Sequence, residues 1–152
     1  MILIQTEDFD VGEEYRALQQ ASPGCGAIVT FSGIVRDMAG QQRVDALVIE
    51  HYPGMTEKSL QSLCEQAHQR WTLGNIRIVH RIGQLAADAQ IVFVGVSSQH
   101  RAEAFAACEF LMDNLKTTAP LWKKQLSGDT QHWLEAKSSD DIAASRWHKQ
   151  AK

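Results

Sequence analysis

The stretch from residue 97 to residue 124 constrains the fold of this chain most, because its pattern changes from helical to extended at one proline. Pro120 cannot continue a helix, and it favours an extended conformation for Ala119. Residues 121–126 are therefore expected to form a strand. Before the proline, apolar residues recur at spacings of three and four, which predicts a helix whose apolar face holds Ala102, Phe105, Ala106, Leu111, Met112 and Leu115.

Three lysines surround this proline, and no acidic residue occurs between positions 114 and 128. Lys116 falls on the last turn of the predicted helix, and alternation along the predicted strand puts Lys123 and Lys124 on opposite faces. One interpretation is a solvated cluster that offsets the negative end of the helix dipole. The other is a site that binds anions and moves protons, because crowded, partly buried cations are expected to lower the pKa of a lysine from about 10.4 towards neutrality.

Two further positions carry candidate anion-binding cations. Residues 91–98 are expected to form a strand that leads directly into a helix near His100, where free N–H groups and the helix dipole favour anions. The side chains of His100 and Arg101 would add donors there, although pairing of Arg101 with Glu103 or another surface acid is an equal alternative. Arg36 ends another predicted strand beside a glycine-bearing loop, where it is either a substrate contact or a solvated charge.

Three other chemistries are not favoured by the sequence. Cys108 points to the same side of its helix as Leu111, which predicts a thiol buried in the core. His51 and His80 each lie at a strand end without a second ligand at metal-binding spacing, so no metal site is expected. The serines at 97–98 lack the glycine-flanked turn of a serine hydrolase.

The composition is that of an ordinary globular domain. A chain of 152 residues predicts a single domain over 1–152, in which about 138–152 form a polar C-terminal tail with a short helix. Hydrophobic residues make up 44% and charged residues 22%. The formal net charge of −3 argues against nucleic acid as the main partner, since proteins that bind phosphate backbones usually carry a basic excess.

The cysteines and the hydropathy pattern predict a cytoplasmic protein. Cys25, Cys64 and Cys108 are an odd number without a C-x-x-C pair, which is typical of a reducing compartment. The N-terminal segment is acidic and its apolar run is too short for a signal peptide. No stretch approaches 18 apolar residues, so no membrane span and no membrane partner are expected.

The remaining elements are expected to alternate between strands and helices, which favours an α+β domain. A loop over 37–43 is expected to be mobile, and a helix is expected to begin with Thr56 as its N-cap. The run 27–35 is rich in β-branched residues and predicts a buried strand. The other expected strands are 1–6, 44–51, 75–85 and 132–136, and a first helix is expected over 11–20.

Four short strings together carry a resemblance to a known family. They are EHYPGMTEK at 50–58, HRIG at 80–83, FVGVSS at 93–98 and LKTTAPLWKK at 115–124. In this order and spacing they resemble the large, catalytic subunit of molybdopterin synthase, and the resemblance extends from about residue 10 to residue 147. It implies an α/β-hammerhead-like fold with an additional antiparallel β subdomain.

The resemblance also implies an activity. Members of this family transfer sulfur to a cyclic pyranopterin monophosphate and so form the dithiolene of molybdopterin. The sulfur comes from a thiocarboxylate on the C-terminal Gly-Gly of a small ubiquitin-like subunit, and no cofactor is implied. The expected assembly is a homodimer of large subunits at the centre of a heterotetramer, with an anionic pterin as substrate.

The resemblance assigns a set of site residues. Lys116 and Lys123 match the lysines on which catalysis depends, and Arg36 ends the string Gly33-Ile34-Val35-Arg36. Many members carry lysine where Ile34 stands and arginine where Thr118 stands and also near Lys137, so the charge at the rim of the site differs here. The substrate-binding set implied is Ile34, Val35, Arg36, His100, Arg101, Lys116, Lys123, Lys124 and Gln125.

Two alternatives from other classes compete with this function. A non-catalytic adaptor that docks the tail of a β-grasp protein would need an apolar groove but no anion site, so the candidate cations argue against it. A nucleic-acid-binding module would need aromatic side chains beside the lysines. Trp122 is a candidate for that role, but the net charge disfavours it.

Overall fold

The computed structural model describes residues 1–135 and 138–148, and its mixed architecture confirms the predicted α+β class. The helices in this part of the chain are α1 (Val11–Gln20), α2 (Met55–Arg70), α3 (Arg101–Thr118) and α4 (Ser138–Ser145). The strands are β1 (Ile2–Gln5), β2 (Ala27–Ile34), β3 (Met38–Ala39), β4 (Gln42–Arg43), β5 (Ala46–His51), β6 (Ile76–Arg81), β7 (Gly83–Ala86), β8 (Gln90–Ser98), β9 (Leu121–Ser127) and β10 (Thr130–Leu134).

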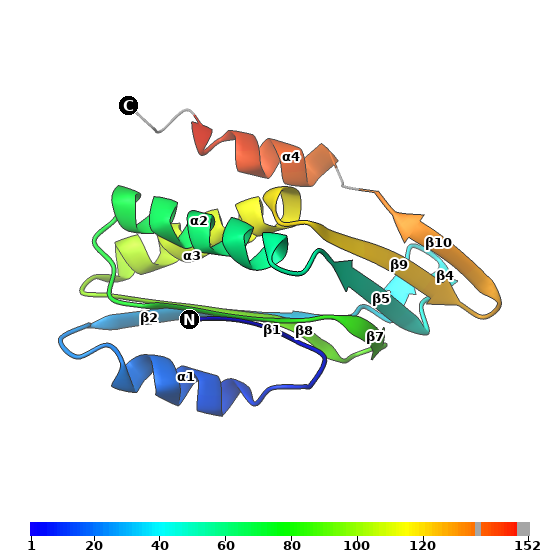
Figure 1. Ribbon diagram of the computed structural model, residues 1–152, viewed down its shortest axis with the longest axis horizontal. Coiled ribbons are helices and arrows are strands. Elements are labelled where there is room, and N and C mark those ends of the chain that lie inside the picture. The colour runs from blue at the N-terminus through cyan, green and yellow to red at the C-terminus, as the bar shows by residue number, and fades with distance from the viewer. Residues whose placement is uncertain (136–137, 149–152) are drawn as a thin grey trace.

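One sheet, in the order β1-β6-β8-β2, carries helices on both faces (Figure 1). β1 is parallel to β6, and the other neighbouring strands are antiparallel. α2 and α3 cover one face and α1 covers the other. α1 begins at Val11 because Asp10 caps it, accepting a hydrogen bond from the backbone N–H of Glu13 at 2.9 Å. Both β1 and α1 lie where the sequence predicts them.

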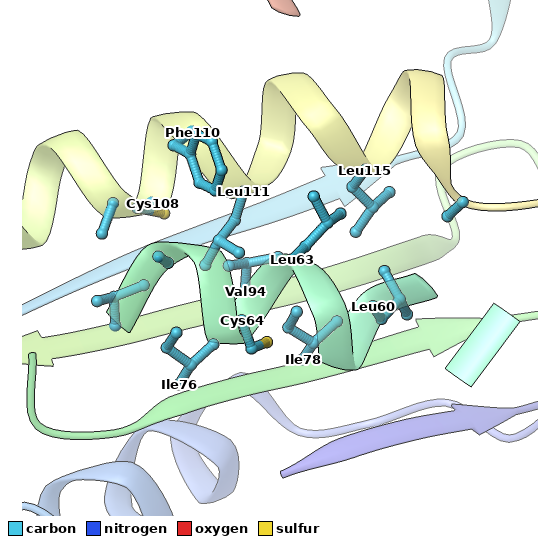
Figure 2. Packing of buried hydrophobic residues seen from close by; sticks show 14 of the residues in the cluster. Leu60, Leu63, Cys64, Ile76, Ile78, Val94, Cys108, Phe110, Leu111 and Leu115 are labelled. Atoms are coloured by element: carbon cyan, nitrogen blue, oxygen red, sulfur yellow. The ribbon is translucent and has the colours of Figure 1, made fainter. Parts of the chain in front are cut away.

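The main core lies between this sheet and the pair α2–α3 (Figure 2). In α2 the buried residues Leu60, Leu63, Cys64 and Ala67 recur at helical spacing and form one apolar face. For α3 the prediction is right at Leu111 and Leu115 but wrong at Ala102 and Phe105, which are exposed. The buried stripe of α3 lies between and beyond those two residues, and it consists of Ala104, Ala107, Cys108, Phe110, Leu111 and Leu115.

A second, antiparallel sheet extends from one end of the first, in the order β10-β9-β5-β7 (Figure 1). β9 follows Pro120 as predicted and pairs with both β5 and β10. The turn between β9 and β10 is at Gly128, whose φ of 58° suits glycine. This sheet has its own apolar cluster, formed by Val35, Val44, Leu47, Ile49 and Leu85, with Ile91 and Leu121 packed against it.

Two strand predictions are corrected. The run 27–35 does not form a buried strand, because β2 is an edge strand with one neighbour, and several of its residues are exposed. Residues 75–85 form two strands, because Gly83 has a φ of 85° and the chain passes there from the first sheet to the second. Alternation along a strand reveals neither its position in a sheet nor a change of sheet.

Two further predictions are corrected: the loop over 37–43 and the N-cap of the helix near residue 56. The segment 37–43, expected to be a mobile loop, forms the short antiparallel pair β3–β4 around Gly40. α2 begins at Met55 with Gly54 as its N-cap, and the Gly54 N–H donates to the Glu57 carboxylate at 2.7 Å. β10 ends at Leu134, and the rest of the strand expected to reach 136 includes residues outside the described part.

Candidate functional site

The lysine end of α3 combines the consecutive elements α3 and β9 with the start of α2, which is distant in sequence. Lys116 lies on the last turn of α3, and the chain returns from Pro120 as β9. The buried hydroxyl of Thr56 bonds to the carbonyls of Tyr52 and Pro120 at 3.1 and 3.2 Å, so it fixes the α3–β9 turn to the start of α2. Thr56 thus anchors this turn rather than capping α2 as expected.

β9 separates its two lysines as predicted. Leu121, Lys123 and Gln125 lie on the inner face, where Gln125 is buried and its Nε2 donates to the Ser127 hydroxyl at 3.3 Å. Lys124 lies on the other face, and its ammonium is 5.2 Å from the centroid of the Trp133 ring. Within one chain, therefore, Lys123 and Lys124 do not present their charges to the same side of the sheet.

A buried histidine lies close to Lys123. His80, on β6, is 1% exposed, and its Nδ1 lies 2.7 Å from the carbonyl oxygen of Arg81. A carbonyl can only accept, so Nδ1 carries the proton. Burial lowers the pKa of His80 to about 4, and the positive charges of Lys123 and His51 act in the same direction. At neutral pH this end of the molecule therefore contains a neutral imidazole. The sequence alone does not reveal that this histidine is buried.

Lys116 has a carboxylate partner that the surrounding sequence lacks. Its Nζ lies 3.8 Å from Oδ1 of Asp140, which belongs to α4. α4 is held on α3 through the residues that follow it, because Trp147 Nε1 donates to Asp113 Oδ2 at 2.8 Å. Arg146 donates to the same oxygen at 2.6 Å. The expected C-terminal helix thus exists and carries an acid into the lysine-rich end.

The two large apolar residues of the C-terminal segment, Ile142 and Trp147, differ in burial. Trp147 is 6% exposed and packs edge-on against Trp71 and Phe110, with ring centroids 5.6 and 5.5 Å away. The guanidinium of Arg70 donates to the Trp147 carbonyl at 2.9 Å. Ile142, in contrast, is 70% exposed.

Arg36 belongs to the same end of the molecule as the lysines. The preceding residue, Val35, is 2% exposed and belongs to the apolar cluster against which Leu121 packs. Two backbone hydrogen bonds hold Val35. Its N–H donates to the carbonyl of Ala89, and its carbonyl accepts from the N–H of Asp88. Arg36 and Ile34 are both exposed beside this anchored residue.

His100 and Arg101 lie at the opposite end of the molecule. Lys116 follows Arg101 by fifteen residues of continuous helix, which is about 22 Å along the axis of α3. In β2–β8, Ile34 faces Gln90 and Ala27 faces Ser98, so the Arg36 end and the His100 end are also separated by the length of β8. Figure 1 shows α3 entered from β8 at one end and left towards β9 at the other. One chain therefore does not bring all predicted site residues together.

The α3 N-terminus is partly occupied by its own chain. His100 is the N-cap without a side-chain hydrogen bond, and its N–H donates to the Ser98 hydroxyl at 3.4 Å. That hydroxyl also lies 3.3 Å from the Glu103 carboxylate, which occupies the first turn. Arg101 is exposed and forms no ion pair with Glu103 within the described residues. Its guanidinium remains available at this corner.

The cysteines and the possible metal ligands can also be located in the structure. Burial raises the pKa of Cys64 and of Cys108 to about 11, and Figure 2 shows both sulfurs inside the main core. Cys108 is thus the core thiol expected from its helix position, and Cys25 is half-buried. Among residues 1–135 and 138–148, no group of three or more acids, histidines and cysteines is arranged to hold a metal ion.

The structure is that of a hammerhead-like α+β protein with an added antiparallel sheet, and cationic side chains lie at both ends of α3. The chain belongs to the MoaE protein family, whose family model matches residues 4–118. It is 54% identical over 146 residues to a molybdopterin synthase catalytic subunit from Vibrio cholerae, covering 96% of this chain and 97% of that one. This longer similarity extends beyond the family match, past Pro120 and into β9.

Solved structures agree with this assignment. A MoaE protein from Burkholderia ambifaria superimposes with a TM-score of 0.84 at 47% identity, covering 97% of both chains. A chain from a complex of subunits 1 and 2 of molybdopterin-converting factor, from Helicobacter pylori, has a TM-score of 0.76 at 19% identity. That similarity covers 90% of this chain and 92% of the other, and it shows the shared fold. Within the described part of the chain, no helix is long and apolar enough to cross a membrane.

Proposed function

We propose that this chain is the catalytic subunit of a molybdopterin synthase. It transfers sulfur from the C-terminal thiocarboxylate of a small ubiquitin-like subunit to cyclic pyranopterin monophosphate and forms the dithiolene of molybdopterin. The observation that carries the proposal is the near full-length similarity to proteins named molybdopterin synthase catalytic subunits. The complex described for the Helicobacter pylori relative supports a small-subunit partner.

In this proposal the lysine end performs the chemistry. Lys116 is the acid/base group and meets the thiocarboxylate carbonyl, while Lys123 stabilises the negative charge that develops during transfer. Buried Gln125 fixes the inner face of β9 beside Lys123. Arg36, with Ile34 and Val35 beside it, contacts the substrate at the same end. Lys124 contributes from the rim on the opposite face of β9.

A complete site requires two copies of the chain. His100 and Arg101 hold the substrate phosphate, but about 22 Å of helix separates Arg101 from Lys116 in one protomer. A two-fold dimer solves this separation if the exposed edge of β2 faces its copy in antiparallel orientation, because the His100 end of one protomer then meets the lysine end of the other. Exposed Phe31 and Ile34, 39% and 55% exposed, give this edge an apolar surface.

Incubation with the pterin precursor and thiocarboxylated small subunit tests the activity. The expected result is dithiolene product, and stoichiometric docking of the small subunit without product would support the adaptor instead. Subunit complementation tests the shared site. Lys116→Ala homodimers should be inactive and Arg101→Ala homodimers should make less product, whereas their reassociated mixture should gain about a quarter of the wild-type rate from the mixed dimers, because half of the dimers are mixed and each has one intact site. No recovery would place both residues in the same protomer's site.

A further inference from the structure

α4 brings a carboxylate to the candidate catalytic lysine. Asp140 is the only acid within ion-pair distance of Lys116 among residues 1–135 and 138–148. The segment 114–128 contains no acid of its own, so this contact exists only because the chain folds back after β10. The ion pair therefore depends on the folded position of α4 and not on residues adjacent to Lys116 in the sequence.

The contact is part of a charge-matched register between two helices. Along α3, Glu109, Asp113 and Lys116 follow one another at spacings of four and three, so they lie on one face. The C-terminal segment runs back along this face, and Arg146 pairs with Glu109 at 2.5 Å and with Asp113 at 2.6 Å. Asp140 then meets Lys116 at 3.8 Å. Any shift of α4 along α3 would break both matches, so the register is fixed at two points.

We propose that Asp140 is a positioning residue for the sulfur-transfer reaction, which holds Lys116 as an oriented ammonium group. The inference rests on the proposed function, in which Lys116 meets the reacting groups. Asp140 itself does not touch substrate; it acts through Lys116. In this arrangement the Lys116 side chain has a fixed direction from which it meets the thiocarboxylate carbonyl.

The surrounding charges make Asp140 the decisive partner. Charged groups on the packed elements are Asp113 on α3, Asp140, Asp141 and Arg146 in the C-terminal segment, and Lys123 and Lys124 on β9. Asp113 is already held by Arg146 and Trp147, and the two charged side chains of β9 are both cations. Removing the Asp140 carboxylate therefore leaves Lys116 without an acidic partner to orient it among the described residues.

The pair is accessible enough to be tested without unfolding the protein. The Lys116 and Asp140 side chains are 46% and 24% exposed, and pairs of this kind contribute little to stability. Trp147 and Arg146 hold the C-terminal segment independently. Asp140→Asn should therefore fold and keep α4 in place. Asp141→Asn is the matched control, because Asp141 is exposed and forms no ion pair within the described residues.

Amine labelling of the intact dimer gives a readout that does not depend on activity. Trace acetic anhydride at fixed pH acylates amines that are not held by a partner, and mass spectrometry gives the rate at Lys116 relative to exposed Lys58. Asp140→Asn should raise the relative rate at Lys116 about twofold to fivefold, whereas Asp141→Asn should not change it. Equal rates in wild type and Asp140→Asn would overturn the proposal.

Steady-state kinetics with thiocarboxylated small subunit tests the role in the reaction. Asp140→Asn should lower kcat with little change in the KM for the small subunit. Asp140→Glu should restore most of the rate. An unchanged kcat in Asp140→Asn, or a change in KM alone, would overturn the proposal. Absence of product with the wild-type protein would instead contradict the proposed function, while the labelling result would still report on the pair.

Discussion

The two ends of α3 differ in how they are made. The His100 end is built from neighbours in sequence, since the last residues of β8, the N-cap and the first helical turn are contiguous. The Lys116 end combines α3, β9 and α4 with a buried anchor from α2. A binding corner can thus be local, whereas the end assigned to chemistry requires a folded framework that fixes the surroundings of its lysines. The predictions below separate these two roles.

The largest effect is expected at the lysine end. Lys116→Ala should reduce product formation by about a hundredfold or more, because a positioned acid/base group contributes at least that much. The melting temperature and small-subunit binding should change little, since a half-exposed lysine at a helix end adds only tenths of a kcal/mol. Lys58→Ala, an exposed lysine on α2, is the control. Near-wild-type product formation by Lys116→Ala would exclude the lysine end as the centre of the chemistry.

At the other end the expected loss is in retention of the intermediate. Two sulfurs enter one dithiolene and each small subunit delivers one, so a half-sulfurated pterin must stay bound while small subunits exchange. Charge-assisted contacts to the phosphate are suited to hold it. Arg101→Ala should release monosulfurated pterin roughly tenfold more when loaded small subunit is scarce. Arg101→Lys should release an intermediate amount, because lysine keeps the charge but lacks the planar guanidinium that donates two parallel hydrogen bonds to one anion. Less product without released intermediate would contradict this assignment.

Sequence predicted the local features of both ends and missed the long-range ones. The single break at Pro120 was sufficient to predict β9 and the opposite orientations of Lys123 and Lys124. Asp140 could not be found, because its contact with Lys116 crosses 24 positions and depends on the register of α4. The same limit applies to His80. Its spacing excluded a metal site, but its burial follows from β6 lying between β1 and β8.

His80 should lower the stability of the folded protein in acid. Its pKa is about 4 in the folded protein, against an ordinary value of 6.5, so the unfolded chain binds its proton first as pH falls. The full stability is present above pH 6.5 and decreases as pH drops from 6.5 towards 4. The gap corresponds to roughly 3 kcal/mol at most.

Denaturant unfolding at several pH values measures this effect. His80→Gln should unfold with a smaller pH dependence between 6.5 and 4 than wild type, although its stability at pH 7 is lower because the site is tightly packed. His100→Gln removes an exposed imidazole at the other end and is the control. Identical pH slopes for wild type and His80→Gln would show that the buried imidazole is not responsible.

The smallest effect on activity is expected from the cysteines, and it tests whether either end uses a thiol. The small subunit carries the sulfur, so no persulfide on this chain is required. Cys64 and Cys108 have pKa values raised to about 11 by burial, which leaves almost no thiolate near neutral pH. Half-buried Cys25 precedes Gly26, whose N–H bonds to Ser98 O, and so it lies at the His100 end, away from the lysines.

A variant with all three cysteines changed to alanine should therefore retain its kcat while losing stability at the two core positions. Its melting temperature and circular dichroism establish that it is folded before the assay. A folded but inactive variant would indicate a cysteine relay, and single restorations would show which of the three thiols takes part.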